Sequence, residues 1–179
     1  MNAPELSRMV RARQLPADPI VVEADADERR ALAKRFDLPQ IALLRAELSL
    51  DTDGKAVRAT GPMTARIVQN CAVSHDEFPV SIDEALNLRF VEEGAPDPAL
   101  AEDGEIEIEL SADDCDEIEY SGDMFDLGEA VAQSLGLAID PYAVGPEADA
   151  ARSGAGIGRE GEQDGPLAEM LAALKGKGS

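Results

Sequence analysis

The 179-residue chain contains no tryptophan, and aromatic residues make up only 3% of it. Proteins that bind single-stranded nucleic acid stack the bases on exposed aromatic rings, and four Phe and two Tyr leave few residues for that role. With so few rings, the core must consist mainly of Leu, Val, Ile and Ala. The hydrophobic fraction of 44% is typical of a globular protein and excludes a wholly disordered chain.

Cysteines and long apolar runs are also scarce. The two cysteines, Cys71 and Cys115, are too few for a disulfide framework. The N-terminal residues contain no run of about seven apolar residues of the kind found in a secretory signal. No segment approaches the roughly 20 apolar residues of a membrane span. We therefore expect a cytoplasmic protein with reduced thiols and no membrane contact.

Positive charge is missing from one long stretch. The net charge is −21, yet residues 1–89 hold 12 Lys and Arg against 14 Asp and Glu. Residues 90–151, which we call the acidic block, hold no Lys or Arg and 19 Asp and Glu. Such a block repels phosphate backbones and favours cationic partners. The alternative is a solvated surface that only keeps the protein in solution.

Turn residues and hydrophobic alternation divide the chain into short elements. One helix is expected after Asp25 or Asp27, either of which can cap it, and it should stop before Pro39. A second helix is expected between Asp126 and Asp140. An Asp-Gly pair at residues 53–54 indicates a hairpin. Strands are expected over residues 19–23, 41–50, 55–60, 63–73, 78–91, 105–110 and 115–120.

These elements predict an α+β fold: a β-rich antiparallel domain with two flanking helices, a mobile N-terminal arm and a C-terminal tail. The last segment has its apolar residues on one helical face. Because so short a helix is marginal alone in water, it must dock on its own domain or on a partner. The expected parts are an arm (1–17), the folded domain (18–143), a disordered linker (144–165) and a short terminal helix (166–175).

Several pieces of sequence occur in an order that matches a known family. The longest runs from Ile67 to Phe90, and Asp126-Leu127-Gly128-Glu129 and Asp140-Pro141 follow it. The chain thereby resembles the YceD family of bacterial proteins, which is linked to accumulation of large-subunit (23S) ribosomal RNA. The resemblance implies ribosome assembly as the setting, because the gene commonly neighbours that of a small basic ribosomal protein. It identifies five family-motif residues: Gln69, Cys71, Asp126, Leu127 and Pro141.

Catalytic or metal chemistry has little support in the sequence. A nucleophile–base pair of Cys71 and His75 would need mutual hydrogen-bond reach and an orienting group. Cys71, His75 and Cys115 are enough for three zinc ligands. However, Ser74 stands where some members of the resembled family carry a second cysteine, and Cys115 is flanked by aspartates. We therefore expect a non-enzymatic protein with no catalytic residue, metal, cofactor or small-molecule substrate.

The sequence favours a ribosome-biogenesis factor that acts by binding. The acidic block suits a basic ribosomal protein or a pre-large-subunit particle, and Glu105, Glu107 and Glu109 would form the anionic face of one strand. A third interpretation is a small structural or regulatory domain whose helix at 166–175 docks into a partner. The alternative to protein binding is direct binding of ribosomal RNA through four helical cations: Arg29, Arg30, Lys34 and Arg35.

Overall fold

A computed structural model of the chain describes residues 4–94 and 116–155. The strand expected over 105–110 and the helix expected over 166–175 lie outside the described residues. The chain divides into two compact units. The first comprises Met1–Gln69 and Pro79–Asp140, and the second comprises Asn70–Phe78 and Pro141–Ser179.

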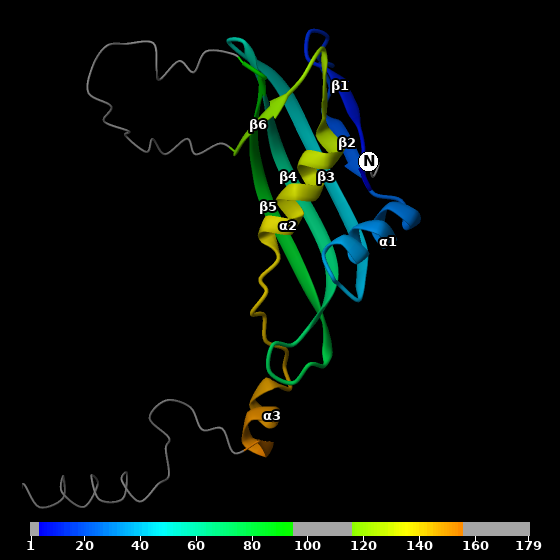
Figure 1. The fold of residues 1–179 in the computed structure, drawn as a ribbon, viewed down its shortest axis with the longest axis vertical. Coiled ribbons are helices and arrows are strands. Elements are labelled where there is room, and N and C mark those ends of the chain that lie inside the picture. The colour runs from blue at the N-terminus through cyan, green and yellow to red at the C-terminus, as the bar shows by residue number, and fades with distance from the viewer. Residues whose placement is uncertain (1–3, 95–115, 156–179) are drawn as a thin grey trace, which may run out of the picture. The chain divides into compact units, whose positions relative to one another are not determined.

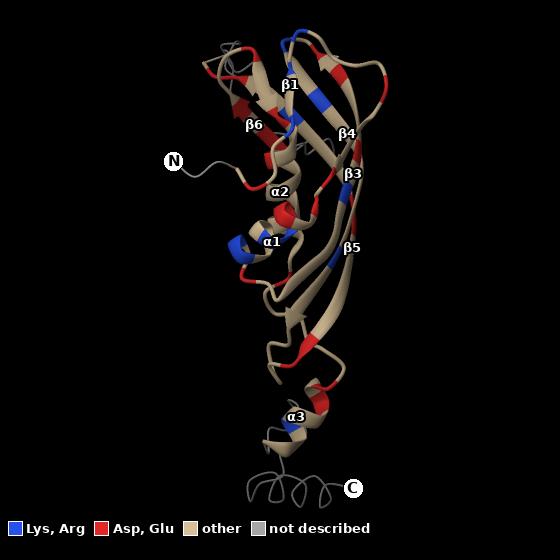
Figure 2. Cartoon of the chain, turned by 90° about the vertical axis from the view of Figure 1, so that its right-hand side faces the viewer, with Lys and Arg blue, Asp and Glu red and all other residues tan. Residues whose placement is uncertain are grey.

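The first unit is a five-stranded sheet that carries two helices on one face (Figure 1, Figure 2). This β-rich arrangement confirms the α+β class. The sheet has the order β2-β3-β4-β5-β6, with strands at Ile20–Glu23, Gln40–Asp53, Ala56–Asn70, Glu77–Glu92 and Asp116–Tyr120. The helices are α1 (Ala26–Arg35) and α2 (Leu127–Ala138), and a two-stranded ribbon pairs β1 (Met9–Arg11) with β7 (Met124–Asp126).

Strict alternation along β3 separates a buried face from a polar face. Leu44, Ala46, Leu48 and Leu50 are buried, and the residues between them are exposed. Because successive side chains of a strand point to opposite faces, this pattern fixes the register against β4. The two strands pair antiparallel and turn at Gly54, whose φ is 63°. The Asp-Gly hairpin predicted from the sequence is therefore confirmed.

β4 is one continuous strand, whereas the sequence predicted a break at Gly61-Pro62. Gly61 has a φ of 155°, and a Cβ built on it would lie 1.9 Å from the main-chain oxygen of Glu47. The glycine therefore permits a close approach of β4 to β3 that no other residue allows. The prediction of a break was wrong because a glycine followed by a proline usually marks a turn. Here the glycine instead allows two strands to pack closely.

The last strand of the sheet corrects the expectation of a purely antiparallel domain. β6 pairs with the end of β5 in a parallel register, from Leu88↔Asp116 to Glu92↔Tyr120. Parallel neighbours need a long connection between them. The number of residues between 92 and 116 is enough for such a connection.

The N-terminal segment, expected to be a loose arm, packs against the first unit. Leu6 has no exposed surface, and Val10 is also buried. β1 pairs antiparallel with β7, with Val10 opposite Phe125. The sequence signal was weak because only two described apolar residues of this segment are buried, with Ala12 and Leu15 partly buried against the core. Leu6 and Val10 are enough to attach it.

Aromatic residues gather at one place in the core despite their scarcity. Phe90 and Phe125 stack with their ring centroids 4.2 Å apart, and Tyr120 lies 5.8 Å from Phe125. Such pairs contribute about 0.5–1.5 kcal/mol beyond the burial of their area. The contact joins β5 to β6 and β7, which lie more than 20 residues further along the chain.

The second unit consists of a turn after β4 and the segment that follows the first unit. The main-chain N–H of Ala72 donates to the oxygen of Ala143 at 3.0 Å. A Cβ on Gly145 would lie 3.0 Å from the ring of Phe78, which shows how closely the two segments pack. Helix α3 (Ala148–Gly154) lies within 144–165, where the sequence predicted a disordered linker.

The close approach at Gly61 gives a direct test of the fold. We expect Gly61→Ala to lower the free energy of unfolding by more than about 3 kcal/mol, because the new Cβ clashes with rigid main chain. Gly54→Ala is the matched control: its φ is also positive, but nothing lies within 4 Å of the added Cβ. We expect Gly54→Ala to lower the free energy of unfolding by only about 1 kcal/mol. Equal losses in urea unfolding would contradict this account of β4.

Candidate functional site

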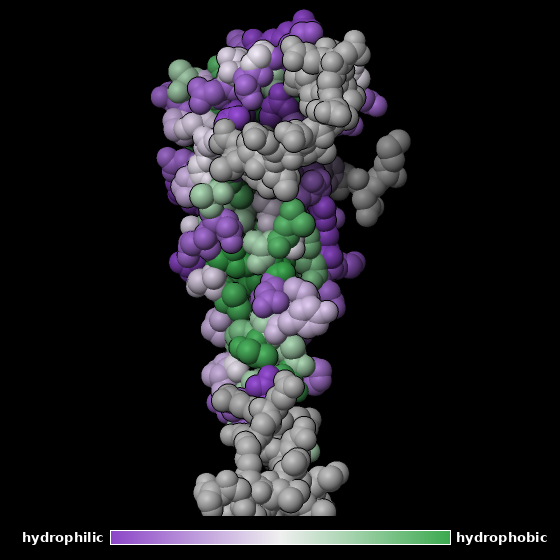
Figure 3. Space-filling model, turned by 90° about the vertical axis from the view of Figure 1, so that its left-hand side faces the viewer, coloured by the Kyte–Doolittle hydropathy of each residue, from purple (hydrophilic) through white to green (hydrophobic). Residues whose placement is uncertain are grey.

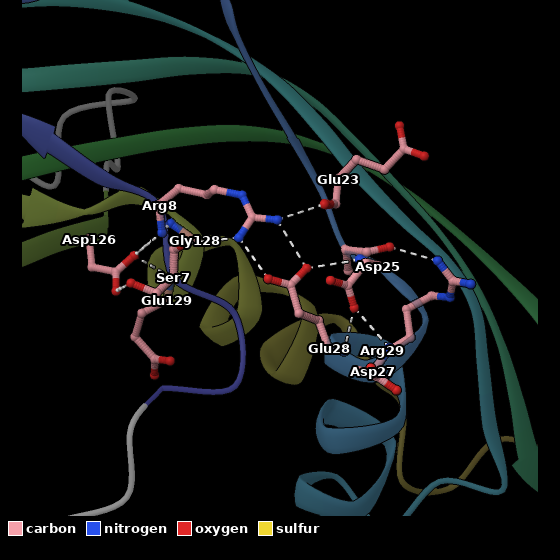
Figure 4. Close-up of polar contacts among 11 residues, drawn as sticks. Ser7, Arg8, Glu23, Asp25, Asp27, Glu28, Arg29, Asp126, Gly128 and Glu129 are labelled. Atoms are coloured by element: carbon pink, nitrogen blue, oxygen red, sulfur yellow. Dashed lines mark hydrogen bonds and ion pairs between the residues drawn. The ribbon is translucent and has the colours of Figure 1, made fainter.

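Asp126 joins α2 to the N-terminal segment (Figure 4). Its Oδ1 accepts hydrogen bonds from the main-chain N–H groups of Gly128 at 3.0 Å and Glu129 at 3.2 Å, which caps the helix. The same oxygen accepts from the N–H of Arg8 at 2.7 Å, and Oδ2 accepts from the hydroxyl of Ser7 at 2.6 Å. One carboxylate thus satisfies donors from segments 118 residues apart.

Arg8 extends this network to α1 (Figure 4). Its guanidinium donates to both carboxylate oxygens of Glu28, at 2.7 and 2.9 Å, and to the main-chain oxygen of Glu23 at 2.9 Å. Glu28 also accepts from the N–H of Asp25, whose side chain caps α1 in a reciprocal capping box. The hydrogen bond from Arg8 is the main reason that the pKa of Glu28 lies below its ordinary value.

Two further residues of the motif at 126–129 have packing roles. Leu127 has no exposed surface. A Cβ on Gly128 would lie 2.7 Å from the main-chain nitrogen of Arg8 and 2.9 Å from the carbonyl carbon of Ser7. Only glycine lets the N-terminal segment pass this close to α2. The motif therefore holds segments together, and its side chains are occupied by that task.

The four helical cations predicted to bind RNA do not form one free patch. Arg35 bridges Glu5 at 3.1 Å and Glu129 at 2.8 Å, and the hydrogen bond to Glu129 is the main reason its pKa is raised. Arg30 pairs with Asp27, as neighbouring turns of a helix allow. The remaining two, Arg29 and Lys34, make no ion pair with the described residues.

A shallow hollow lies beside α1, where the helix meets the start of β3. Arg29 and Arg30 line it together with apolar side chains of α1 and with Gln40 and Ile41 of β3. Arg29 also donates to the main-chain oxygen of Ala24 at 2.6 Å, which fixes its guanidinium near the helix start. Two helical arginines therefore line the same depression.

Four arginines on the sheet were missed by the sequence interpretation. Arg45, Arg58, Arg66 and Arg89 lie on the polar face, and each is within ion-pair distance of a carboxylate on the same or a neighbouring strand. Figure 2 shows the basic and acidic stretches interleaved along these strands. The alternation of apolar and polar residues along each strand places the arginines on the solvent face. Their partners on the next strand depend on the register between strands, which cannot be deduced from the alternation alone.

Arginines from outside the acidic block neutralise part of it. Arg13 lies 3.8 Å from Asp123, and Arg35 pairs with Glu129 as described above. Arg89 of β5 pairs with Glu117 of β6. The described part of the block is therefore less anionic than its sequence alone implies. Glu105, Glu107 and Glu109, predicted to bind a partner, lie outside the described residues.

Cys71 lies in a tight turn of the second unit. Its side chain is 1% exposed, and its sulfur accepts hydrogen bonds from the N–H groups of Val73 and Ser74, both at 3.4 Å. These bonds, with the Ser74 side chain as the largest cause, lower the pKa of the thiol to about 6. His75 donates its main-chain N–H to the oxygen of Cys71 and has a φ of 63°.

The turn does not assemble the catalytic or metal sites weighed from the sequence. Among the described residues, the side chain of His75 makes no hydrogen bond to Cys71, and no group of three His, Cys, Asp or Glu residues is placed to hold a metal ion. Cys115 lies outside the described residues. The low pKa of Cys71 therefore reflects the Ser74 side chain together with local main-chain donors, and not a partner base.

The other two family-motif residues have different surroundings. Gln69, at the end of the first unit's β4, is buried and donates its Nε2 to the main-chain oxygen of Asp140 at 2.9 Å. This bond ties the chain after α2 to the sheet. Pro141 belongs to the second unit and is exposed. The five motif residues therefore do not converge on a single site within either unit.

Comparison with known proteins identifies the family of the chain. The sequence model of the family described as large ribosomal RNA subunit accumulation protein YceD matches residues 59–175. The chain belongs to the YceD family. The family is tied by that description to ribosome biogenesis and accumulation of large-subunit ribosomal RNA. No curated protein and no solved structure matches the chain.

A separate observation concerns membranes. In the ranges 4–94 and 116–155, none of the helices is both long enough and apolar enough to span a bilayer.

The Arg8–Glu28 pair predicts a pH-dependent stability. The pKa of Glu28 is lower in the folded state than its ordinary 4.5, so the pair stabilises the protein fully above that pH and less as the pH falls through the folded pKa. We expect Arg8→Gln to cost about 1–2 kcal/mol at pH 7 and clearly less in acid. Arg11→Gln, which removes an exposed unpaired arginine, should change stability by less than about 0.5 kcal/mol. A pH-independent loss for Arg8→Gln, in urea titrations, contradicts the assignment.

The Cys71 turn predicts a thiolate near neutral pH. In a Cys115→Ser background, absorbance at the thiolate band should titrate with a midpoint at about pH 6 instead of the ordinary 9.0. Ser74→Ala should move the midpoint upward, because the Ser74 side chain is the largest cause of the shift. A wild-type midpoint near 9 would show that the turn does not stabilise the thiolate.

Proposed function

We propose that this protein supports accumulation of large-subunit ribosomal RNA by binding a basic ribosomal protein, alone or in an assembling particle, and not by catalysing a reaction. Its setting would be the cytoplasm. The family supplies the process, and the distribution of charge on the described residues supports the kind of partner.

One observation carries the choice of partner: most of the described positive charges are already paired with carboxylates. Every described Lys or Arg lies within ion-pair distance of a carboxylate, except Arg11, Arg29, Lys34 and Lys55. The chain nevertheless carries a net charge of −21. The charge left for a partner is therefore negative. Binding to phosphates requires clustered free Lys and Arg, whereas a basic protein complements what remains.

Ribosomal proteins of this kind are cationic and bind RNA nonspecifically through that charge. A carboxylate-rich surface competes with RNA for them, because it offers the same sign of charge as phosphate. The contact would form fast and weaken with salt. Holding a basic protein until its RNA site is ready would favour productive assembly. Large-subunit RNA that is not assembled would otherwise fail to accumulate.

Direct RNA binding is the second candidate, and one observation favours it. Arg29 and Arg30 line the same hollow beside α1, and Lys34 on that helix has no ion pair among the described residues. This is a small basic patch of suitable sign. Arg35 is unsuitable as a contact because it bridges Glu5 and Glu129. The RNA alternative therefore depends on three residues rather than four.

Sedimentation of tagged protein through a sucrose gradient tests the proposal. At low salt we expect the protein to travel with pre-large-subunit particles, and a purified basic ribosomal protein to bind it. Changing Glu105, Glu107 and Glu109 to Gln should reduce that binding several-fold, with a smaller salt dependence. The matched control changes three other carboxylates, Asp18, Asp37 and Asp51, to Asn.

The RNA alternative predicts the opposite pattern. Changing Arg29, Arg30 and Lys34 to Gln, with Arg35 left intact, should then abolish comigration with particles while the glutamate variant keeps it. Absence of the wild-type protein from every particle fraction, together with no capture of a basic ribosomal protein, would overturn the proposal.

A further inference from the structure

Among the described residues of the first unit, one stretch of β5 has no strand paired along its outer side. β4 lies along one side of it, and β6 pairs on the other side only from Leu88 to Glu92. Within residues 4–94 and 116–155, no strand pairs with residues 79–87 on that side, which we call the open edge of β5. Such an edge presents a row of main-chain N–H and C=O groups that a further strand can pair with.

The edge carries two features that oppose indiscriminate pairing. Pro79 removes one main-chain donor. Glu84 occupies the position between Ile82 and Leu86, which are 7% and 9% exposed, yet it is itself exposed and makes no ion pair with the described residues. A charge on the core-facing side of an edge strand discourages a purely apolar neighbour. A strand that places a Lys or Arg beside Glu84 pairs with its carboxylate, so the charge of Glu84 does not oppose the binding of such a strand.

Apolar surface accompanies the same edge. Val80 of β5 is only partly buried, as are Ala138 and Ile139 at the end of α2, and Leu137 is 80% exposed. Figure 3 views the side on which β5 and α2 lie, and hydrophobic residues gather in the middle of its described surface. Exposed apolar surface of this kind marks binding sites more often than scattered single residues do.

Asn87 lies where the pairing with β6 stops. Its side-chain oxygen is buried and has no hydrogen-bond partner among the described residues. An unpaired buried acceptor costs free energy that a donor from a neighbouring strand recovers.

We propose that the open edge of β5 binds an extended segment of a basic partner protein, which adds to the sheet as a further strand. The main chain of the segment pairs with residues 79–87, alternate apolar side chains cover the exposed apolar surface, and a Lys or Arg meets Glu84. This inference rests on the proposed function, and it specifies where and in what conformation the basic partner binds.

The sign of the charge favours a partner over the chain's own neighbouring segment. Residues 95–115 contain no Lys or Arg and eight Asp and Glu, so they bring no cation to Glu84. Asp83 adds to the negative charge of the edge, although Arg66 lies 3.6 Å from it. A basic strand satisfies both the main-chain groups and the carboxylate.

Synthetic peptides test the edge directly. We expect a short peptide that alternates valine and lysine to bind the full chain, and a peptide that alternates valine and glutamate not to bind. A strand at an edge uses the N–H groups of alternate residues only. N-methylation of one alternate set should therefore abolish binding, and N-methylation of the other set should leave it unchanged. If N-methylation of either set of alternate residues reduces peptide binding equally, the proposal is overturned.

A side-chain variant tests the role of Glu84. Glu84→Gln should lower the affinity for the valine–lysine peptide about twofold to fivefold, which is the range for an exposed ion pair. It should lower the affinity for a basic ribosomal protein to a similar extent. Glu47→Gln, the same change on the polar face of β3, should have no effect. Equal effects of the two variants on peptide affinity overturn the assignment of Glu84.

Amide hydrogen exchange identifies the occupant. The N–H groups of residues 79–87 that face outward should exchange fast in the free protein and slowly with the lysine peptide. If they are already protected and deletion of 105–110 exposes them, the chain's own segment fills the edge. If protection is lost on dilution, a second copy fills it. Either result overturns the proposal.

The two levels of inference fail in different ways. If the basic ribosomal protein binds but leaves exchange at residues 79–87 unchanged, the edge assignment is wrong and the proposed function stands. If the lysine peptide protects the edge but the protein never travels with pre-large-subunit particles, the edge is a binding site and the proposed function is wrong.

Discussion

The hydrogen bonds of Asp126 are the constraint on which the first unit depends. A single carboxylate caps α2 and also accepts from Ser7 and Arg8, so the position of the helix and that of the N-terminal segment are determined together. Arg8 then reaches Glu28 and thereby α1. Charge-assisted hydrogen bonds are the stronger kind. Both helices on the covered face of the sheet are thus connected through one short polar network.

Local signals in the sequence predicted the elements well where a single residue type decides the conformation. Asp25 and Asp126 cap helices, as the positions of these aspartates indicate, and Gly54 turns a hairpin. The break predicted at Gly61 and the loose arm predicted before β2 failed for a common reason. Both depend on what a distant segment contributes, Glu47 in one case and Phe125 in the other. Neither contact is visible in a local pattern.

The sequence establishes how much charge of each sign the chain carries, and the structure shows which of the described charges are paired. Counting residues showed where carboxylates are in excess, and the family confirms the ribosomal setting. Ion pairs across strands, such as Arg89 with Glu117, depend on register and on the parallel direction of β6. No sequence rule supplies these. They matter because they decide which charges remain for a partner, and they remove most arginines from consideration as phosphate contacts.

Attachment of the first residues to the last strand has a consequence during synthesis on the ribosome. β1 cannot pair with β7 until residue 126 has been translated and has left the exit tunnel, and the bond between Arg8 and Asp126 spans 118 positions. Contacts so distant in sequence form late and slow the acquisition of the native state. Until then Leu6 and Val10 stay exposed to solvent and to chaperones. The nascent chain therefore completes this domain only after β7 has left the exit tunnel.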